Sequence, residues 1–330
     1  MQLTVPDDQV QTESIDSSAS TSEHAISESA QRDERRWPQT FRALRHRNYR
    51  LFWTGQLVSL TGTWMQSVAQ GWLVYSLAKS DPVFGPALWL GLTSFFFSLP
   101  VMLFSLVGGV VADRVDRRKF LLFTQAASLV QALTYGILAV TGTIQIWQIP
   151  MLAFFLGTIQ AFDTPVRQAI VLQLVSREDL MNAIALNSSA FNSTRIIGPG
   201  IAGLLLGSFA AWLHSGFGVS EELETKMAAA LCFFLNALSY IGPMAGLSLI
   251  RIESSKNGKS RDSVWRSLRE GLMYVRAHPA ILGILSLVGV SSIFGFSYIT
   301  LLPLFAGKVL NVGPQGYGLL MAGAGVGALS

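Results

Sequence analysis

The chain has 330 residues, of which 50% are hydrophobic and only 13% are charged, whereas an ordinary soluble domain carries about 25% charged residues. This composition excludes an ordinary water-soluble domain, and the single cysteine, Cys232, excludes an intrachain disulfide and a cysteine metal cluster. The net charge of +4 does not indicate a nucleic-acid partner, because the basic residues flank apolar segments.

The chain begins with a polar tail, residues 1–36, which we expect to be disordered and cytoplasmic. Apolar runs follow, and about 20 apolar residues suffice for a membrane-spanning helix. The expected spans are 50–78, 84–111, 119–141, 147–172, 183–213, 227–250, 280–306 and a partial run at 314–330. This pattern predicts an all-α polytopic membrane protein. Because the last run has no polar flank, we expect the sequence to be a fragment that lacks further spans.

Lys and Arg gather on alternate connections between the expected spans. Seven arginines precede the first span, four basic residues lie between spans two and three, and seven lie between spans six and seven. The opposite connections hold only Lys79, Lys226 and Lys308. By the positive-inside rule we expect a multi-pass protein of the cytoplasmic (inner) membrane with a cytoplasmic N-terminus and the lipid bilayer as a partner.

A polar segment divides the chain into two membrane parts. Residues 37–250 hold six expected spans, 251–279 form a cytoplasmic linker, and 280–330 begin a second bundle. The linker ends in an amphipathic stretch that places Trp265, Leu268, Leu272 and Val275 on one helical face. Such a helix is expected to lie on the membrane surface.

The first span carries a polar stripe. Its members, spaced three and four residues apart on one helical face, are Gln56, Ser59, Thr63, Gln66 and Gln70. Lipid cannot satisfy these groups, so the stripe faces protein or water. One interpretation is hydrogen bonding between helices. The other is the wall of an aqueous cavity, and here we expect Gln66 and Gln70 to line it.

The fourth span brings an acid and a base into the membrane. Asp163 and Arg167 are four residues apart, where an ion pair can form, and Gln160 shares their face. A carboxylate inside a membrane indicates either a proton relay or a structural partner. Both roles remain open for Asp163, and Arg167 is close enough to the surface to extend toward water.

The fifth span carries a cation near the middle of the membrane. Arg195 shares a helical face with Asn192 and Ser188. A cation at that depth costs at least about 2.5–3.5 kcal/mol unless it is paired or hydrated. We therefore expect Arg195 and Asn192 to contact the substrate or a carboxylate that carries a proton.

The connection between spans two and three resembles the signature of the major facilitator superfamily. The matching residues are Gly109, Asp113, Arg114, Arg117 and Arg118. Asp116 stands where that family usually has glycine. The resemblance implies two six-helix bundles, of which this chain holds the first and about two helices of the second. It also implies that this cluster is a cytoplasmic latch between the bundles, and Gly108 and Gly109 are expected to allow close helix packing.

A second motif resembles one that antiporters of the same superfamily carry in the fifth span. Its matching residues are Gly198, Pro199 and Gly203. The stretch "AFDTPVRQAIVLQLVSREDLMNAIALNSS" resembles a subgroup that includes enterobactin and macrolide exporters, although Gln173 is neutral near the place where that subgroup has an acidic residue.

These observations favour a secondary transporter. We expect proton-coupled efflux of small amphipathic molecules, such as a siderophore, a drug or a macrolide, by a monomer that alternates access to a central site. A lipid flippase of the same fold is the alternative, and a scaffold without transport is a third. No HExxH, GxSxG or Walker motif indicates an enzyme, and no cofactor or metal is expected.

Overall fold

The computed structural model describes residues 38–79, 81, 83–250, 269, 273–295 and 297–328. The expected tail at 1–36 and most of the linker at 251–279 lie outside these residues. The first bundle is formed by α2 (Arg47–Ala78), α3 (Gly85–Arg114), α4 (Arg117–Val140), α5 (Gln148–Leu174), α6 (Leu180–Phe217), α7 (Glu221–Ser239) and α8 (Ile241–Leu249). A short 3-10 helix, Gln39–Arg45, precedes α2.

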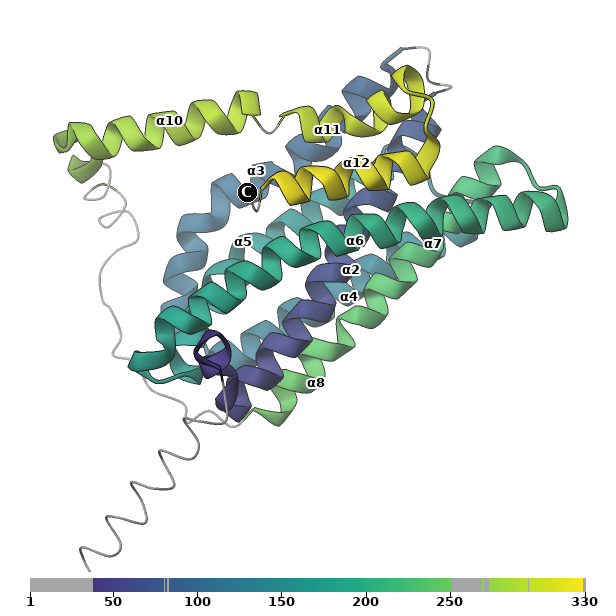
Figure 1. The fold of residues 1–330 in the computed structure, drawn as a ribbon. Coiled ribbons are helices and arrows are strands. Elements are labelled where there is room, and N and C mark those ends of the chain that lie inside the picture. The colour runs from purple at the N-terminus through teal and green to yellow at the C-terminus, as the bar shows by residue number, and fades with distance from the viewer. Residues whose placement is uncertain are drawn as a thin grey trace, which may run out of the picture.

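The bundle is arranged around α2, which packs against α3, α6, α7 and α8 (Figure 1). Among the described residues, five helical segments are long and apolar enough to cross a membrane: Gly85–Ser105, Arg117–Val140, Gln148–Leu174, Arg177–Phe217 and Glu221–Leu249. The helix at the first expected span, α2, is not among them, because its polar stripe lowers its hydropathy. Its position between other helices explains how that stripe is tolerated.

The helices at the sixth and seventh expected spans are each described in two parts. The sixth is divided at Tyr240, because Pro243 has no N–H for the carbonyl of Ser239. The seventh, expected as one helix over 280–306, is described as α10 (Pro279–Gly295) and α11 (Ser297–Leu304), followed by a π-helical turn; residue 296 between them lies outside the described residues. Figure 1 shows α10 projecting sideways from the bundle. The last helix, α12 (Gly313–Gly327), runs along α6.

The crossing of α3 and α5 depends on glycine. A Cβ atom at Gly108 would collide with the carbonyl oxygen of Ala161, and one at Gly157 would collide with that of Phe97. Pro165 lacks the N–H that would otherwise bond the Ala161 carbonyl, so this freed acceptor lies against the α carbon of Gly108. The expectation of close packing is confirmed for Gly108. It is wrong for Gly109, because a Cβ atom there would meet open space.

The turn between α3 and α4 contains only Val115 and Asp116. Asp116 accepts a hydrogen bond from the backbone N–H of Lys119 at 3.1 Å and thereby caps α4. Its φ of −65° is ordinary for any residue, so the turn does not need the glycine that the resemblance leads one to expect.

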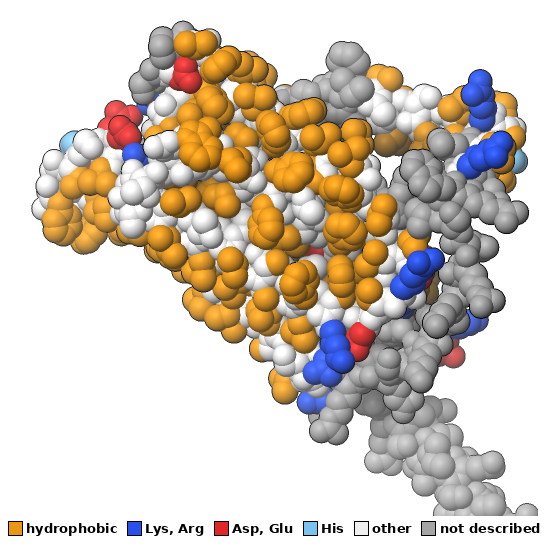
Figure 2. Space-filling model, turned by 180° about the vertical axis from the view of Figure 1, so that it is seen from behind, with side chains coloured by type: hydrophobic (Ala, Val, Ile, Leu, Met, Phe, Trp, Pro, Cys, Tyr) orange, Lys and Arg blue, Asp and Glu red, His pale blue; other side chains and the backbone are white. Residues whose placement is uncertain are grey.

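The surface of the bundle is apolar. Exposed side chains on α3 to α5 include Phe95, Met102, Phe123 and Phe155. Figure 2 shows hydrophobic side chains over most of the middle of one face, with most Lys and Arg gathered toward one end. Since a water-soluble monomer rarely exposes so large an apolar area, this belt is the surface that contacts lipid.

Candidate functional site

A polar cavity with a volume of about 260 Å³ lies among α2, α4, α5 and α6. We call it the polar cavity. Its wall includes three members of the α2 stripe, namely Gln56, Ser59 and Thr63. Further polar lining residues include Gln125, Gln160, Thr164, Arg167, Asn187 and Tyr240, and Phe52, Leu60 and Phe191 form an apolar part of the wall. The N-terminal part of the stripe therefore lines a cavity, and whether that cavity is aqueous stays a prediction.

Asp163 and Arg167 form an ion pair at the edge of this cavity. Arg167 donates to Oδ2 of Asp163 from Nε at 2.7 Å and also from Nη2. The other carboxylate oxygen, Oδ1, accepts hydrogen bonds from Thr124 Oγ1 and from Gln125 Nε2 at 3.1 Å. Asp163 is only 1% exposed, whereas the guanidinium of Arg167 reaches the cavity wall. The cation of the pair therefore lines the cavity, whereas the buried carboxylate of Asp163 does not.

The spacing of the pair follows from the helix, but its burial does not. Positions four apart lie on one face of α5, which brings the two side chains into contact. The facing side chains of α4, Thr124 and Gln125, then enclose the carboxylate. A charge in a poorly solvated place is stable only when it is paired and hydrogen-bonded, and both conditions hold here.

Gln66 lies in a separate buried network. Its Oε1 accepts from Asn236 Nδ2 at 2.7 Å, and its Nε2 donates to Gln131 Oε1 at 3.2 Å. These contacts join α2, α4 and α7, and Gln131 also donates to the carbonyl of Leu152. Gln66 therefore bonds helices together and does not line the polar cavity. Gln70, the last member of the stripe, is half-buried.

Arg195 and Asn192 also lie outside the polar cavity. The side-chain amide of Asn192 donates to the carbonyl of Ser188 on its own helix at 2.9 Å. The guanidinium of Arg195 stands over the ring of Trp64, 5.8 Å from its centroid, which is a cation–π distance. The structure does not bring Arg195 to Asp163.

The two glycines of the second motif allow α6 to approach other helices. A Cβ atom at Gly198 would collide with Trp64 of α2, and one at Gly203 would collide with Gly318 of α12. Pro199 is buried inside α6 between these crossings. The two glycines of the motif thus allow α6 to pack closely against α2 of the first bundle and against α12, which follows the linker.

The basic residues of the first motif bind helix ends. Arg118 donates to the carbonyls of Leu247 at 2.7 Å and Ser248 at 2.6 Å, at the C-terminus of α8. Arg117 donates to the carbonyls of Ala112 and Ala169, each at 3.2 Å, and lies 3.9 Å from Asp113. Cations are favourable at helix C-termini, where carbonyl groups lack partners. Arg114 is exposed and also takes part in an interaction.

Sequence reasoning missed a charged cluster at the start of α6. The carboxylate of Asp179 is fully buried and lies 3.0 Å from Arg42, 3.0 Å from Arg45 and 2.7 Å from His46. Asn182 bonds the backbone of the same N-terminal segment, since its Oδ1 accepts from the N–H of Ala43 at 2.8 Å. Residues more than 130 positions apart meet here, and no local pattern in the sequence links them.

We expect Asp179→Asn to lower the free energy of unfolding by about 2 kcal/mol, because its buried Oδ2 accepts a hydrogen bond from Arg45 at 3.0 Å and its Oδ1 forms an ion pair with Arg42. Thermal unfolding of the purified protein in detergent measures this. Glu178→Gln is the matched control. Its side chain is 78% exposed and lies 3.7 Å from Arg42, so we expect a change within about 0.5 kcal/mol. Equal effects of the two variants would show that the cluster does not hold the N-terminal segment.

Comparisons with known proteins give a consistent result. A family model described as transmembrane secretion effector matches residues 38–330. The staphyloferrin A transporter of Staphylococcus aureus is 26% identical over 281 residues, which cover 84% of this chain and 64% of that protein. Macrolide efflux protein A of Streptococcus pyogenes is 24% identical over 258 residues, which cover 77% of this chain and 56% of that protein. The chain thus spans less than two thirds of the length of these relatives.

A solved structure shows the same fold. It is a bacterial homologue of the human lysosomal transporter Spinster in an inward-facing and unoccupied conformation, with a TM-score of 0.59 and 16% identity. The match covers 83% of this chain and 60% of that one.

Proposed function

The chain belongs to the transmembrane secretion effector family of the major facilitator superfamily, and we propose that it is part of a secondary transporter that exports small amphipathic molecules. The relatives carry names of a siderophore transporter and a macrolide efflux protein, and molecules of these kinds are the substrates that we propose. The fold is the all-α membrane architecture that the sequence indicates.

The observation that carries this proposal is the polar cavity with Arg167 in its wall. A membrane protein places many hydrogen-bonding side chains inside its bundle only at a cost, unless they meet each other or a polar ligand. Gln66 and its partners satisfy one another, whereas the groups around Arg167 surround an open space of about 260 Å³. We propose that this space is part of the substrate path and that the second bundle supplies the remainder.

Asp163 is the proposed site of proton coupling. As an anion it holds Arg167 through charge-assisted hydrogen bonds, which are stronger than those between neutral groups. Protonation of Asp163 removes that charge and releases the guanidinium toward the cavity, where it can bind an oxygen acceptor of the substrate. Proton binding and substrate binding are then linked through a single side chain, and each favours the other.

The charged ends of the bundle support a cytoplasmic N-terminus. Arg42, Arg45 and His46 lie at the end of the bundle that holds Arg117 and Arg118, while Lys79 lies at the other end of α2. We propose that the contacts of Arg117 and Arg118 with α5 and α8 belong to a latch that opens as the bundles rock.

The test uses the full-length protein in everted membrane vesicles with an imposed pH gradient. Candidate siderophores, macrolides and lysolipids are added in turn, and collapse of the gradient is followed by a pH-sensitive dye. We expect wild type to respond to a siderophore or macrolide and Asp163→Asn to respond at least about tenfold more slowly. Glu178→Gln, an exposed carboxylate, serves as the control and should respond as wild type does.

Equal responses of wild type and Asp163→Asn would move the proton site to another residue and leave export in place. A response to lysolipids alone would favour a lipid flippase. If no compound affects the gradient, the exporter proposal fails.

A further inference from the structure

A second cavity, with a volume of about 320 Å³, lies at the opposite end of the bundle from Asp179. We call it the terminal pocket. It is formed by the last turns of α2, the second half of α6, the first turns of α7 and the start of α12. It shares no lining residue with the polar cavity. Its size is within the range of pockets that hold small organic molecules.

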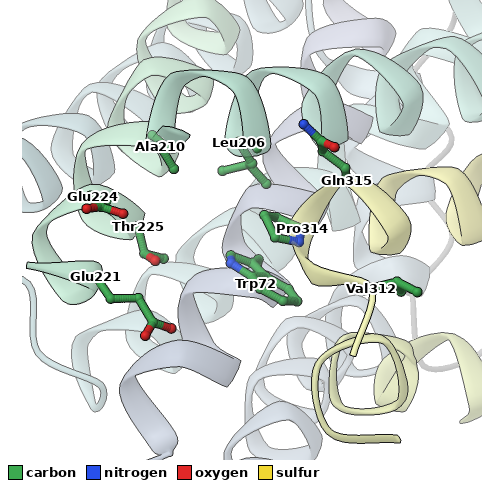
Figure 3. Close-up of a pocket in the computed structure, with 11 residues that line it drawn as sticks. Trp72, Leu206, Ala210, Glu221, Glu224, Thr225, Val312, Pro314 and Gln315 are labelled. Carbon is green, nitrogen blue, oxygen red and sulfur yellow. The ribbon is translucent and has the colours of Figure 1, made fainter. Parts of the chain in front are cut away.

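The two sides of the terminal pocket differ in chemistry. Figure 3 shows Glu221, Glu224 and Thr225 on one side and Trp72 and Gln315 on the other. The remaining wall is apolar and comes from α6 and the start of α12, with Leu206, Ala210, Val312 and Pro314. A ligand that fits both sides needs a polar head and an apolar body.

The polar side carries negative charge. Glu221 pairs with Lys79 at 3.1 Å, and Glu222 pairs with Lys226 at 2.7 Å. The third carboxylate of this turn, Glu224, is only 8% exposed and lies 2.8 Å from His214 Nδ1. Within the described part of the chain it forms no ion pair with a lysine or arginine. Three carboxylates on the first turn of α7 thus lie beside two ammonium groups and one imidazole.

Thr225 supplies a second indication of a ligand. Its side chain is only 8% exposed, and within the described parts of the chain its hydroxyl has no hydrogen-bond partner. The hydroxyl oxygen itself is not fully enclosed but is accessible from the pocket, where water or a ligand can bond it. Because Thr225 follows Glu224 directly and lines the pocket with it, a donor placed between them can serve both oxygens.

Trp72 provides a rigid aromatic wall. Its ring is stacked on Tyr317 at a centroid distance of 6.2 Å and contacts Tyr75 at 5.2 Å, so its orientation is fixed by α12 as well as by α2. Aromatic faces attract cations and pack against apolar groups. The carboxylates of the other wall disfavour an anion. A metal ion is also disfavoured, because the described residues contain no group of three or more metal-binding side chains.

We propose that the terminal pocket binds a small organic cation, namely a protonated amine joined to an apolar or aromatic body. Glu224 balances its charge, the hydroxyl of Thr225 accepts one of its N–H bonds, and Trp72 packs against the body. This site is distinct from the proposed transport path, and its ligand need not be the transported molecule.

The test is calorimetric titration of the purified full-length protein in detergent with 2-phenylethylammonium. We expect saturable binding in wild type, binding at least about tenfold weaker in Glu224→Gln, and binding about threefold weaker in Thr225→Val. Glu222→Gln is the matched control, because its carboxylate lies on the same turn but is 64% exposed and does not line the pocket. It should bind as wild type does.

Two ligands of the same shape test the chemical class. We expect neutral 2-phenylethanol to bind at least about tenfold more weakly than the amine, and anionic 3-phenylpropanoate not to bind. Absence of amine binding in wild type at millimolar concentration, equal binding by Glu224→Gln, or equal binding of the anion would each overturn the proposal. Thermal unfolding verifies that each variant is folded. If Glu224→Gln does not fold, Thr225→Val still tests the pocket, because valine has nearly the same shape as threonine. Because no step depends on transport, a failed vesicle assay leaves this result intact.

Discussion

Arg167→Leu is expected to lower the free energy of unfolding by about 3 kcal/mol and to abolish transport. The substitution removes the cation that pairs with Asp163 and leaves a carboxylate that is 1% exposed. Breaking a buried pair by removal of one partner typically costs about 3–5 kcal/mol, and the partial exposure of Arg167 places the expected value at the lower end. Thr124 and Gln125 still donate to the carboxylate, but neither carries charge.

A double-mutant cycle separates the free energy of the interaction between Asp163 and Arg167 from the effect of each substitution alone. In Asp163→Asn/Arg167→Leu both charges are absent, so we expect most of the lost stability to return, with a coupling free energy of about 2 kcal/mol. Arg167→Lys retains the charge but loses the two-pronged contact with Oδ2, and should be intermediate. Unfolding in detergent is measured for wild type, Asp163→Asn, Arg167→Leu, the double variant and Arg167→Lys. If the single and double variants are equally unstable, Arg167 contributes by packing and the ion pair has no role in stability.

Gly108→Ala is expected to lower the free energy of unfolding by about 2 kcal/mol or more. The new methyl group would overlap the carbonyl oxygen of Ala161, which is backbone and cannot rotate away. Helices α3 and α5 would have to separate, and forcing extra volume into a packed contact costs about 1–3 kcal/mol. The yield of folded protein and its unfolding temperature in detergent report the change.

The adjacent residue supplies the control. Gly109→Ala places its methyl group in open space, and alanine is the better helix former. We expect its unfolding free energy to stay within about 1 kcal/mol of wild type. A stable Gly109→Ala that fails in transport would indicate that Gly109 is needed in another conformation of the latch. Equal destabilisation by both variants would contradict the packing argument.

Local patterns sufficed for several features of the membrane fold. The apolar runs predict where helices lie, and five of the described helical segments are long and apolar enough to cross a bilayer, although α2 at the first expected span is not. The pairing of Asp163 with Arg167 also follows from sequence, since four residues make slightly more than one helical turn. Even the cap at Asp116 depends only on the next few residues.

The α2 stripe shows where local reasoning ends. Helical periodicity places Gln56 and Gln66 on one face, yet the first lines the polar cavity and the second is enclosed by Gln131 and Asn236. The difference arises from side chains on α4 and α7, which are 65 and 170 residues away from Gln66. Periodicity predicts that the face is polar, but only neighbouring helices decide whether its partner is water or an amide.

The sequence by itself therefore determined that the chain forms membrane helices, which faces are polar, and that an acid and a base meet on α5. Only the tertiary structure decided that Asp179 secures the N-terminal segment, that Arg167 faces a cavity while Asp163 is concealed, and that Glu224 and Thr225 share a pocket with Trp72. The physical reason is the distance along the chain over which each effect acts. Hydropathy and helical spacing act within a few turns, whereas burial and the identity of a partner depend on residues that the chain brings together only when it folds.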